Sequence, residues 1–143
     1  MGKEQLEELE KYGKYLSVPH GISMWPMIRN SKDIVEIRKI EKPPVRYDLV
    51  MYVRPDSQGV IHRVLHPGED IYIINGDNCW QKERVKPEQI KGIVTRFCRK
   101  GKWHDVTEKK YLIYVHLMAD LFFIRRPLYY VRDRIKYRRR KKK

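Results

Sequence analysis

Short apolar runs separated by turn residues fill the chain between Ser17 and Trp103, and this pattern constrains the fold more than any other feature. Val, Ile and Tyr dominate the runs, and several runs alternate apolar with polar side chains, as half-buried strands do. The runs cover residues 33–40, 48–53, 60–65, 71–74 and 90–98. Pro, Gly, Asn and Asp between them indicate tight turns. The sequence therefore predicts a small, mainly β domain with an antiparallel sheet.

The segments on either side of this pattern follow helical spacing instead. Leu6 and Leu9 fit one face of a short amphipathic helix. After residue 108, apolar residues again recur at helical spacing, and His116 and Asp120 form an i,i+4 polar pair. We expect Pro127 to break or kink this second helix. The predicted organisation is a short N-terminal helix (1–16), a β-domain (17–107) and a basic amphipathic helical tail (108–143).

Positive charge is concentrated in the C-terminal tail. Residues 125–143 contain eleven Lys or Arg and one acid, Asp133, in a chain whose net charge is +14. Basic amphipathic helices bind anionic membrane surfaces, so such a surface is a candidate partner for residues 109–143. The alternative is that residues 111–124 pack on the β-domain and the tail is only solvated. The same charges attract phosphate, but without a recognised binding motif we do not expect a nucleic-acid partner.

Cysteine spacing and hydropathy restrict the class of protein. Cys79 and Cys98 lack CxxC spacing, which excludes a disulfide scaffold and argues against a zinc site. The most apolar stretch, residues 111–124, is short of the roughly 20 apolar residues that cross a bilayer. Residues 3–14 contain no apolar run of the kind found in signal peptides. We therefore expect a cytoplasmic protein, or one bound peripherally at the cytoplasmic face of the membrane.

Three short clusters contain the residue types of a hydrolytic site. Gly21 and Pro26 flank Ser23, which indicates a tight turn that can expose the serine hydroxyl. His62 lies in an apolar, strand-like run, where its pKa can be tuned. Asp77 lies in an Asn-Gly-Asp-Asn turn. Each cluster alone is usually structural, but together they supply a nucleophile, a base and an acid that orients the base.

The segments around these residues resemble the sequence boxes of type I signal peptidases. The boxes, in chain order, are Ser23-Met24-Trp25-Pro26 (S-M-x-P), Lys32-Asp33-Ile34-Val35 (G-D-x-V), Tyr47-Asp48-Leu49-Val50 (a second such segment), Ile61-His62-Arg63-Val64 (H-R-V) and Gly76-Asp77-Asn78 (G-D-N). A histidine in the H-R-V box is similar to the archaeal and endoplasmic-reticulum branch, where it replaces the bacterial lysine base. The resemblance covers roughly residues 17–98.

This resemblance implies a fold of coiled antiparallel strands shared with LexA-type self-cleaving repressors. It implies a serine endopeptidase that cleaves an extended segment of a precursor protein after small residues, with no metal or small cofactor. Ser23 is then the nucleophile and His62 the general base. The branch uses two acids, one in the G-D-N box and one six residues beyond it. Asp77 is our first choice for the acid that orients His62, and Glu83, in place of the usual Asp, is the alternative.

The chain departs from the family pattern at three points. Gly21 replaces a serine whose hydroxyl helps to hold the oxyanion, which leaves backbone N–H groups for that role. Loss of one oxyanion donor typically costs on the order of 10²–10³ in rate. Lys32 replaces a glycine, and from residues 3–14 we expect no N-terminal membrane anchor of the kind that the family has. These departures leave one alternative open, a catalytically weak or inactive adaptor of the same fold that binds peptides or a membrane surface.

Overall fold

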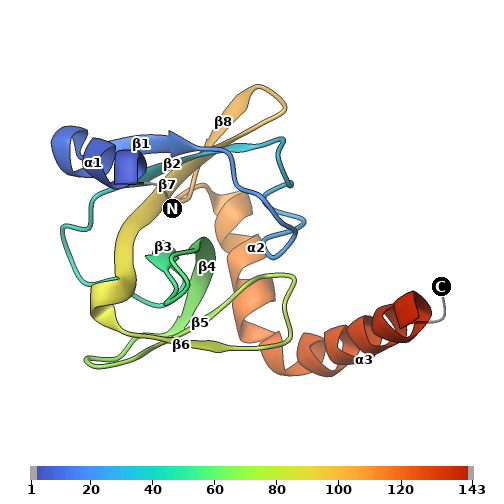
Figure 1. The fold of residues 1–143 in the computed structure, drawn as a ribbon. Coiled ribbons are helices and arrows are strands. Elements are labelled where there is room, and N and C mark those ends of the chain that lie inside the picture. Colours follow the sequence, from blue (N-terminus) through green and yellow to red (C-terminus); the bar gives the residue numbers. More distant parts are fainter. Residues whose placement is uncertain (1–2, 142–143) are drawn as a thin grey trace.

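The five apolar runs and three further short segments form eight strands, which join into one open antiparallel sheet (Figure 1). A computed structural model describes residues 3–141 of the chain. The strands are β1 (Lys14–Ser17), β2 (Ile34–Arg38), β3 (Leu49–Val53), β4 (Gly59–His66), β5 (Tyr72–Asn75), β6 (Glu83–Val85), β7 (Ile90–Arg99) and β8 (Lys102–Asp105). The helices are α1 (Lys3–Tyr12), α2 (Lys109–Asp120), α3 (Phe122–Lys141) and a single 3₁₀ turn (Pro87–Gln89).

The long strand β7 lies at the centre of the sheet. β2 pairs with one side of β7, and β3 and β8 pair in succession with its other side. The strand order is β1-β2-β7-β3-β4-β5-β6, which makes β1 and β6 the outer strands. Register shifts interrupt three of the pairings, β2 with β7, β3 with β7 and β4 with β5. Such bulges bend strands and increase their twist, and here they curve the sheet around its core.

Both faces of the central strands are covered by apolar side chains. One cluster joins the sheet to α1 through Leu9 and to α2 through Val115. A second cluster on β3, β4 and β5 continues to β6. Because both faces are covered, two polar residues in the middle of β4 are buried, with His62 2% and Arg63 0% exposed. Buried polar groups are costly unless they are hydrogen-bonded, so β4 requires partners for both side chains.

The expected antiparallel sheet is confirmed, and its five predicted strands lie within two residues of their expected bounds. The sequence pattern missed β1, β6 and β8, which have only three or four residues each. Each of them contains at most two apolar residues, so no apolar run marks it, unlike the equally short β5. β1 begins at Lys14, so the sheet starts inside the segment 1–16 that was expected to be a helix.

The helical content corrects the expectation of a mainly β protein. Helices contain about as many residues as strands, so the architecture is mixed. The predicted pair is confirmed, with His116 Nδ1 2.9 Å from Asp120 Oδ2. The expected break at Pro127 is not found. The chain turns at Leu121 instead, and α3 continues through Pro127.

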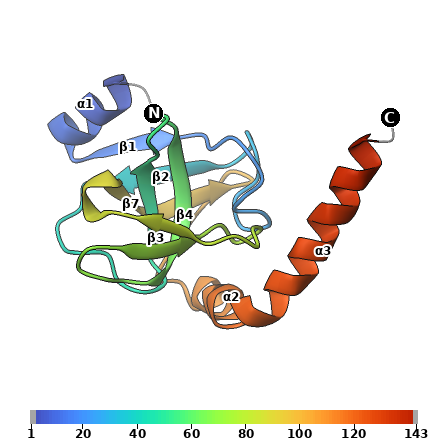
Figure 2. The ribbon, with the colours of Figure 1, turned by 60° about the horizontal axis from the view of Figure 1, so that its bottom comes forward.

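The C-terminal end of α3 stands clear of the sheet (Figure 2). Arg125 and Arg132, on either side of Pro127, bind the body of the protein and keep this part of α3 helical despite the proline. Within residues 3–141, no helix combines the length and the apolar character needed to cross a membrane.

Candidate active site

A cleft of about 1210 Å³ contains the two residues predicted as nucleophile and base. Ser23 and His62 both line it, and so does Glu83 at the start of β6. The edge strand β1 and the residue after it form one wall through Leu16 and Val18. Ligand sites for small molecules typically measure about 300–1,000 Å³, so this cleft has room for an extended peptide segment.

The Ser23 turn is held by the turn that contains the G-D-N residues. The Asn78 N–H donates to the Ser23 carbonyl oxygen at 2.7 Å, and the Asn78 side-chain amide donates to the Ile22 carbonyl oxygen at 3.0 Å. On the other side, the Gly21 N–H donates to the side chain of Asn30 at 2.8 Å. Gly21 has a φ of 99°, a conformation that favours glycine at this position. The serine backbone is therefore fixed by hydrogen bonds on both sides.

Gly76 brings the Ser23 turn close to the imidazole of His62. A Cβ atom at position 76 would lie 2.9 Å from His62 Nε2, from the Ser23 carbonyl oxygen and from Cys79 Sγ. Only glycine fits this space without displacing backbone, so Gly76 allows the Ser23 carbonyl oxygen and His62 Nε2 to lie close together. The buried Nε2 of His62 hydrogen-bonds no described residue, the Ser23 hydroxyl included. Catalytic hydrogen bonds are often longer before substrate binds, and this geometry leaves Nε2 available to accept a proton.

The other imidazole nitrogen of His62 faces two acceptors. Nδ1 lies 3.1 Å from the Tyr52 hydroxyl and 3.2 Å from Glu83 Oε1. The Tyr52 hydroxyl donates its proton to Glu83 Oε2 at 2.7 Å, so its oxygen can only accept from His62. The network therefore requires the proton on Nδ1 and leaves a lone pair on Nε2. This is the tautomer that a general base needs.

Glu83 is ionised and held from its far side by Arg54. Arg54 Nε and Nη2 donate to the two carboxylate oxygens at 2.9 and 2.5 Å. Burial alone would raise the pKa of Glu83, but hydrogen bonds from His62, Arg54 and Tyr52 outweigh burial and hold this pKa well below its ordinary value. A carboxylate in this state orients His62 and stabilises its protonated form. Burial, followed by the hydrogen bond to Glu83, raises the pKa of Tyr52, which stays protonated.

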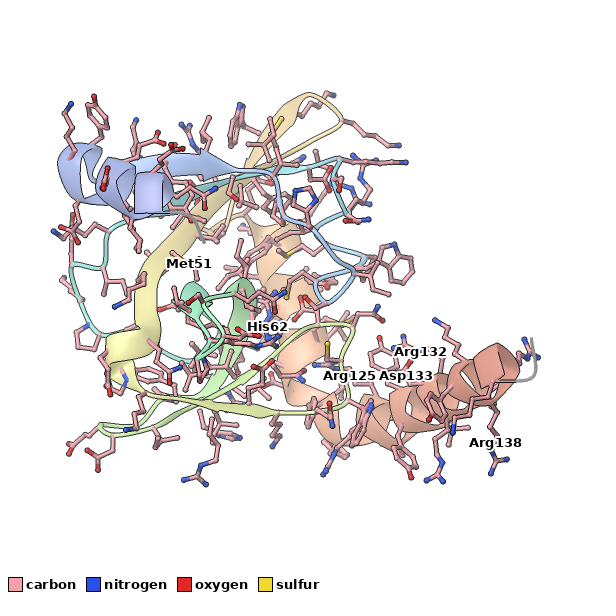
Figure 3. All side chains as sticks on the ribbon, viewed as in Figure 1. Met51, His62, Arg125, Arg132, Asp133 and Arg138 are labelled. Atoms are coloured by element: carbon pink, nitrogen blue, oxygen red, sulfur yellow. The ribbon has the colours of Figure 1, made fainter. Side chains whose placement is uncertain are left out.

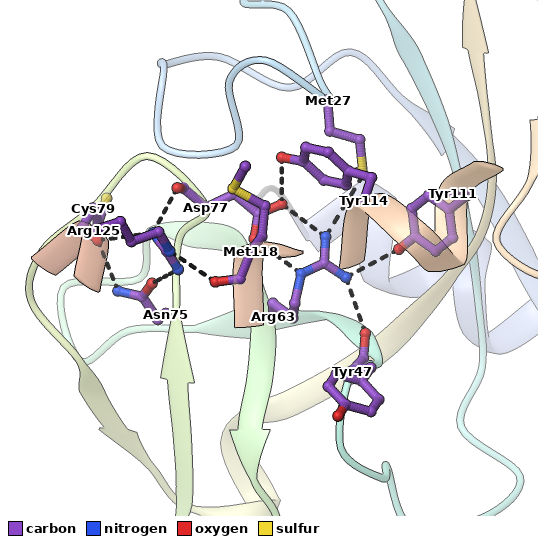
Figure 4. A network of polar contacts seen from close by, with 10 residues as sticks. All are labelled: Met27, Tyr47, Arg63, Asn75, Asp77, Cys79, Tyr111, Tyr114, Met118 and Arg125. Atoms are coloured by element: carbon purple, nitrogen blue, oxygen red, sulfur yellow. Dashed lines mark hydrogen bonds and ion pairs between the residues drawn. The ribbon is translucent and has the colours of Figure 1, made fainter. Parts of the chain in front are cut away.

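Asp77 has a different set of partners (Figure 4). Arg63 Nε and Nη2 donate to its two carboxylate oxygens at 2.9 and 2.7 Å, and the Tyr114 hydroxyl donates to one of them at 2.9 Å. Asp77 and Arg63 are both fully buried. The geometry thus reverses the order of preference between the two acids, because Glu83 and not Asp77 lies beside His62. Asp77 anchors the turn that supports Ser23.

Two arginines of α3 complete this support, and the sequence analysis missed both (Figure 3). Arg125 donates to the Asp77 carbonyl oxygen at 2.7 Å and to the Asn75 side chain at 2.8 Å. Arg132 donates to the side-chain oxygen of Asn78 at 2.5 Å and to its carbonyl oxygen at 3.0 Å. Nothing in the sequence distinguishes these two from the other basic residues of the tail. Their role becomes visible only when α3 is placed against the turn.

The arrangement can remove a proton from a hydroxyl or a water positioned between Ser23 and His62, and Glu83 then stabilises the imidazolium that forms.

Tyr52, Arg54 and Arg63 were also missed as parts of the site. Arg63 was quoted only as a letter of the H-R-V box, and neither Tyr52 on β3 nor Arg54, which follows β3, was given a role in the site. None of the protein-family models, curated proteins or solved structures compared with the chain matches it.

Proposed function

We propose that the protein is a serine endopeptidase that cleaves an extended segment of a precursor protein after small residues. The observation that carries this proposal is the state of His62, whose Nε2 is buried and unpaired beside the Ser23 turn while Nδ1 is held by Glu83. The resemblance of the Ser23, His62 and Asp77 segments to the His-type branch of type I signal peptidases supports it. That family and its LexA-like fold supply the expectation of small residues before the cleaved bond.

In this mechanism the Ser23 oxygen attacks the scissile carbonyl carbon while its proton passes to His62 Nε2. Glu83 stabilises the imidazolium, which then gives the proton to the leaving amine. Water, deprotonated by the same His62, hydrolyses the acyl-enzyme. The oxyanion needs donors, and within residues 3–141 the Ser23 N–H donates no hydrogen bond. Since Gly21 has no side-chain donor, this N–H is the proposed oxyanion contact.

The edge strand β1 is the proposed docking site for the substrate backbone. It lines the cleft and is the outer strand of the sheet next to β2. Extended peptides commonly add to such edges, where main-chain hydrogen bonds give affinity and alternate side chains enter pockets. Residues Leu16 and Val18 would then flank the bound segment.

The test is cleavage of a peptide library that presents Ala-x-Ala sites, with the intact protein, Ser23→Ala and His62→Ala. His104→Ala serves as the matched histidine control, because His104 lies on β8 and does not line the cleft. We expect cleavage by the intact protein and the control, and its loss in the other two variants. Circular dichroism of all four proteins establishes that they are folded.

Equal cleavage by all variants would assign the activity to a contaminant and contradict the proposal. Cleavage by none of them, together with peptide binding by the intact protein, would favour the non-catalytic adaptor instead. In that case the unpaired Nε2 of His62 would need another ligand.

We further propose that α3 contacts an anionic membrane surface. Four apolar side chains spaced by three or four residues are exposed along it, namely Ile124, Leu128, Val131 and Ile135. Basic residues follow this apolar stripe toward the C-terminus. A helix with these two features lies in the plane of a lipid headgroup layer.

A further inference from the structure

One end of the cleft that contains Ser23 and His62 is formed by the C-terminal helix α3. Arg126 of α3 lines this cleft together with Trp80 and Lys82 from the loop before β6. The same three residues also line a second cavity of about 480 Å³. The two cavities therefore meet at Trp80, Lys82 and Arg126, and a peptide in the cleft can extend into the second one.

The second cavity, called here the Trp80 pocket, combines aromatic walls with a cationic rim. Its lining residues are Trp80, Lys82, Phe122, Phe123, Arg126 and Tyr130, with Pro127 between the last two. The rings of Trp80 and Tyr130 meet edge to face, with their centroids 5.0 Å apart. Phe123 is 71% exposed, so part of this aromatic surface is open to a ligand.

The two cations of the pocket have no carboxylate partner within residues 3–141. The Lys82 ammonium lies 4.8 Å from the centroid of the Phe122 ring and forms no ion pair, and Arg126 forms neither an ion pair nor a side-chain hydrogen bond. Across both cavities the only carboxylate is Glu83, which Arg54 already holds. An anionic group entering here would meet two cations and no opposing acid.

We propose that the Trp80 pocket binds an acidic part of the peptide substrate, so that the protein selects segments with Asp or Glu near the cleaved bond. This role of the pocket rests on the proposed peptidase function and adds the substrate class to it. The connection of the pocket to the cleft with Ser23 and His62 favours a peptide over a free anion, because one chain can occupy both. Exposed ion pairs contribute modestly, so the gain is selectivity between segments and not high affinity.

The experiment measures binding to Ser23→Ala protein, which cannot complete the proposed reaction, by fluorescence anisotropy at low salt. Two labelled peptides share an Ala-x-Ala core, and one has Glu on both flanks where the other has Gln. We expect the Glu peptide to bind about 3- to 10-fold more tightly, as two exposed charge pairs allow. The difference should shrink at high salt, because salt screens exposed charges. Adding Lys82→Gln and Arg126→Gln to the Ser23→Ala protein should abolish the difference in affinity between the two peptides.

A matched control removes two positive charges elsewhere, through Lys109→Gln and Arg139→Gln, and should keep the preference for Glu. If this control also loses the preference for Glu, the preference comes from the net charge of the protein, and the proposed role of the Trp80 pocket is wrong. Equal binding of the two peptides, or no binding of either, would also overturn it. If the protein binds the Glu peptide preferentially but the intact protein cleaves no peptide, the acid-binding role of the Trp80 pocket stands and the peptidase function is rejected. If the intact protein cleaves peptides without a preference for charge, the peptidase function stands and the acid-binding role of the pocket is rejected.

Discussion

At the scale of single residues, the site separates two acids that the sequence placed close together, the part-exposed Glu83 and the buried Asp77. Glu83 accepts from Arg54 and Tyr52 and lies 3.2 Å from His62 Nδ1. Asp77 is joined to Arg63 in a fully buried ion pair. In the proposed mechanism Glu83 therefore acts on the base, His62, whereas Asp77 holds the turn that supports the proposed nucleophile, Ser23. The two roles predict different consequences when each charge is removed.

We expect Glu83→Gln to reduce catalysis far more than stability. A glutamine amide can donate to Nδ1 and favour the wrong tautomer of His62, and the corresponding change in a Ser-His-Asp triad costs on the order of 10⁴ in rate. Asp77→Asn leaves the Arg63 charge buried without its partner, which typically costs about 3–5 kcal/mol of stability. Peptide cleavage and urea unfolding of both variants measure this contrast. A Glu83→Gln protein with normal kcat would contradict the proposed role of Glu83.

Much of the site could be predicted because its signals are local. Ser23 lies in a short turn and His62 in a strand, and both keep recognisable neighbours in the sequence. The choice between Asp77 and Glu83 could not be predicted. Glu83 reaches His62 only because β6 pairs with β5 and β5 with β4, and Tyr52 reaches it from β3 on the other side. Strand order decides these contacts, and a single sequence does not contain it.

At the scale of elements, hydrogen bonds connect α3 to Ser23, the proposed nucleophile, through Asn78. Arg132 donates twice to Asn78, and Asn78 donates to the Ile22 and Ser23 carbonyl oxygens. We expect Arg132→Ala to lower kcat about 10-fold with little change in KM, since a charged hydrogen bond contributes about 1.5–3 kcal/mol. Arg132→Lys should restore part of the loss. Arg139→Ala, a change farther along α3, is the control and should behave like the unmodified protein.

The same series separates a positioning role from a purely structural one. A structural role would lower the melting temperature of Arg132→Ala and leave kcat unchanged at temperatures where the protein is folded. A change in KM alone would assign Arg132 to substrate binding. Only a fall in kcat with partial rescue by lysine agrees with a helix that positions Ser23 through Asn78.

A second element-scale prediction concerns the pairing of β2 with β7. Glu36 on β2 accepts from Arg96 and Thr95 on β7 and from Arg38. Burial alone would raise the pKa of Glu36, but these hydrogen bonds lower it from 4.5 to about 2. The native state therefore binds this proton less readily than the unfolded chain. The resulting stability is fully present above about pH 5 and is lost as the pH falls toward 2.

Urea unfolding across this pH range measures the effect. The shift corresponds to at most about 3 kcal/mol, and the half-exposed arginine heads reduce that value by solvent screening. We expect Glu36→Gln to be less stable at neutral pH and to lose less stability on acidification. Glu69→Gln, which removes an exposed acid outside the sheet, should keep the full acid dependence. An unchanged acid dependence in Glu36→Gln would assign the loss to other carboxylates.

The sequence predicted the strands that contain apolar runs, and it missed the elements whose position depends on packing against the rest of the protein. The strands of the central sheet were found because each contains a run rich in apolar residues. The edge strand β1 and the short β6 have no such pattern, yet both line the cleft. Pro127 did not end the helix, because Arg125 and Arg132 tie α3 to the body on both sides of it.

At the scale of the whole molecule, charge and exposed apolar surface gather on the same helix. The chain has a net charge of +14, and residues 125–143 hold eleven of its basic residues. Ile124, Leu128, Val131 and Ile135 are each about half exposed or more along α3. Arg125 and Arg132 face the body, whereas Arg138 and Arg139, farther along α3, are exposed and available to a partner (Figure 3). This separation allows the helix to support the site and to bind a surface at the same time.

We expect the full chain to cosediment with vesicles that contain phosphatidylglycerol and not with vesicles of phosphatidylcholine alone. Each basic residue near an anionic surface contributes about 1 kcal/mol, so Arg138→Gln and Arg139→Gln should each weaken binding about 5-fold. Leu128→Gln should weaken it through the apolar stripe. Val45→Gln, an equally exposed apolar residue of the body, is the control and should have no effect. Equal binding to vesicles with and without phosphatidylglycerol, or binding that high salt does not weaken, would contradict an electrostatic contact.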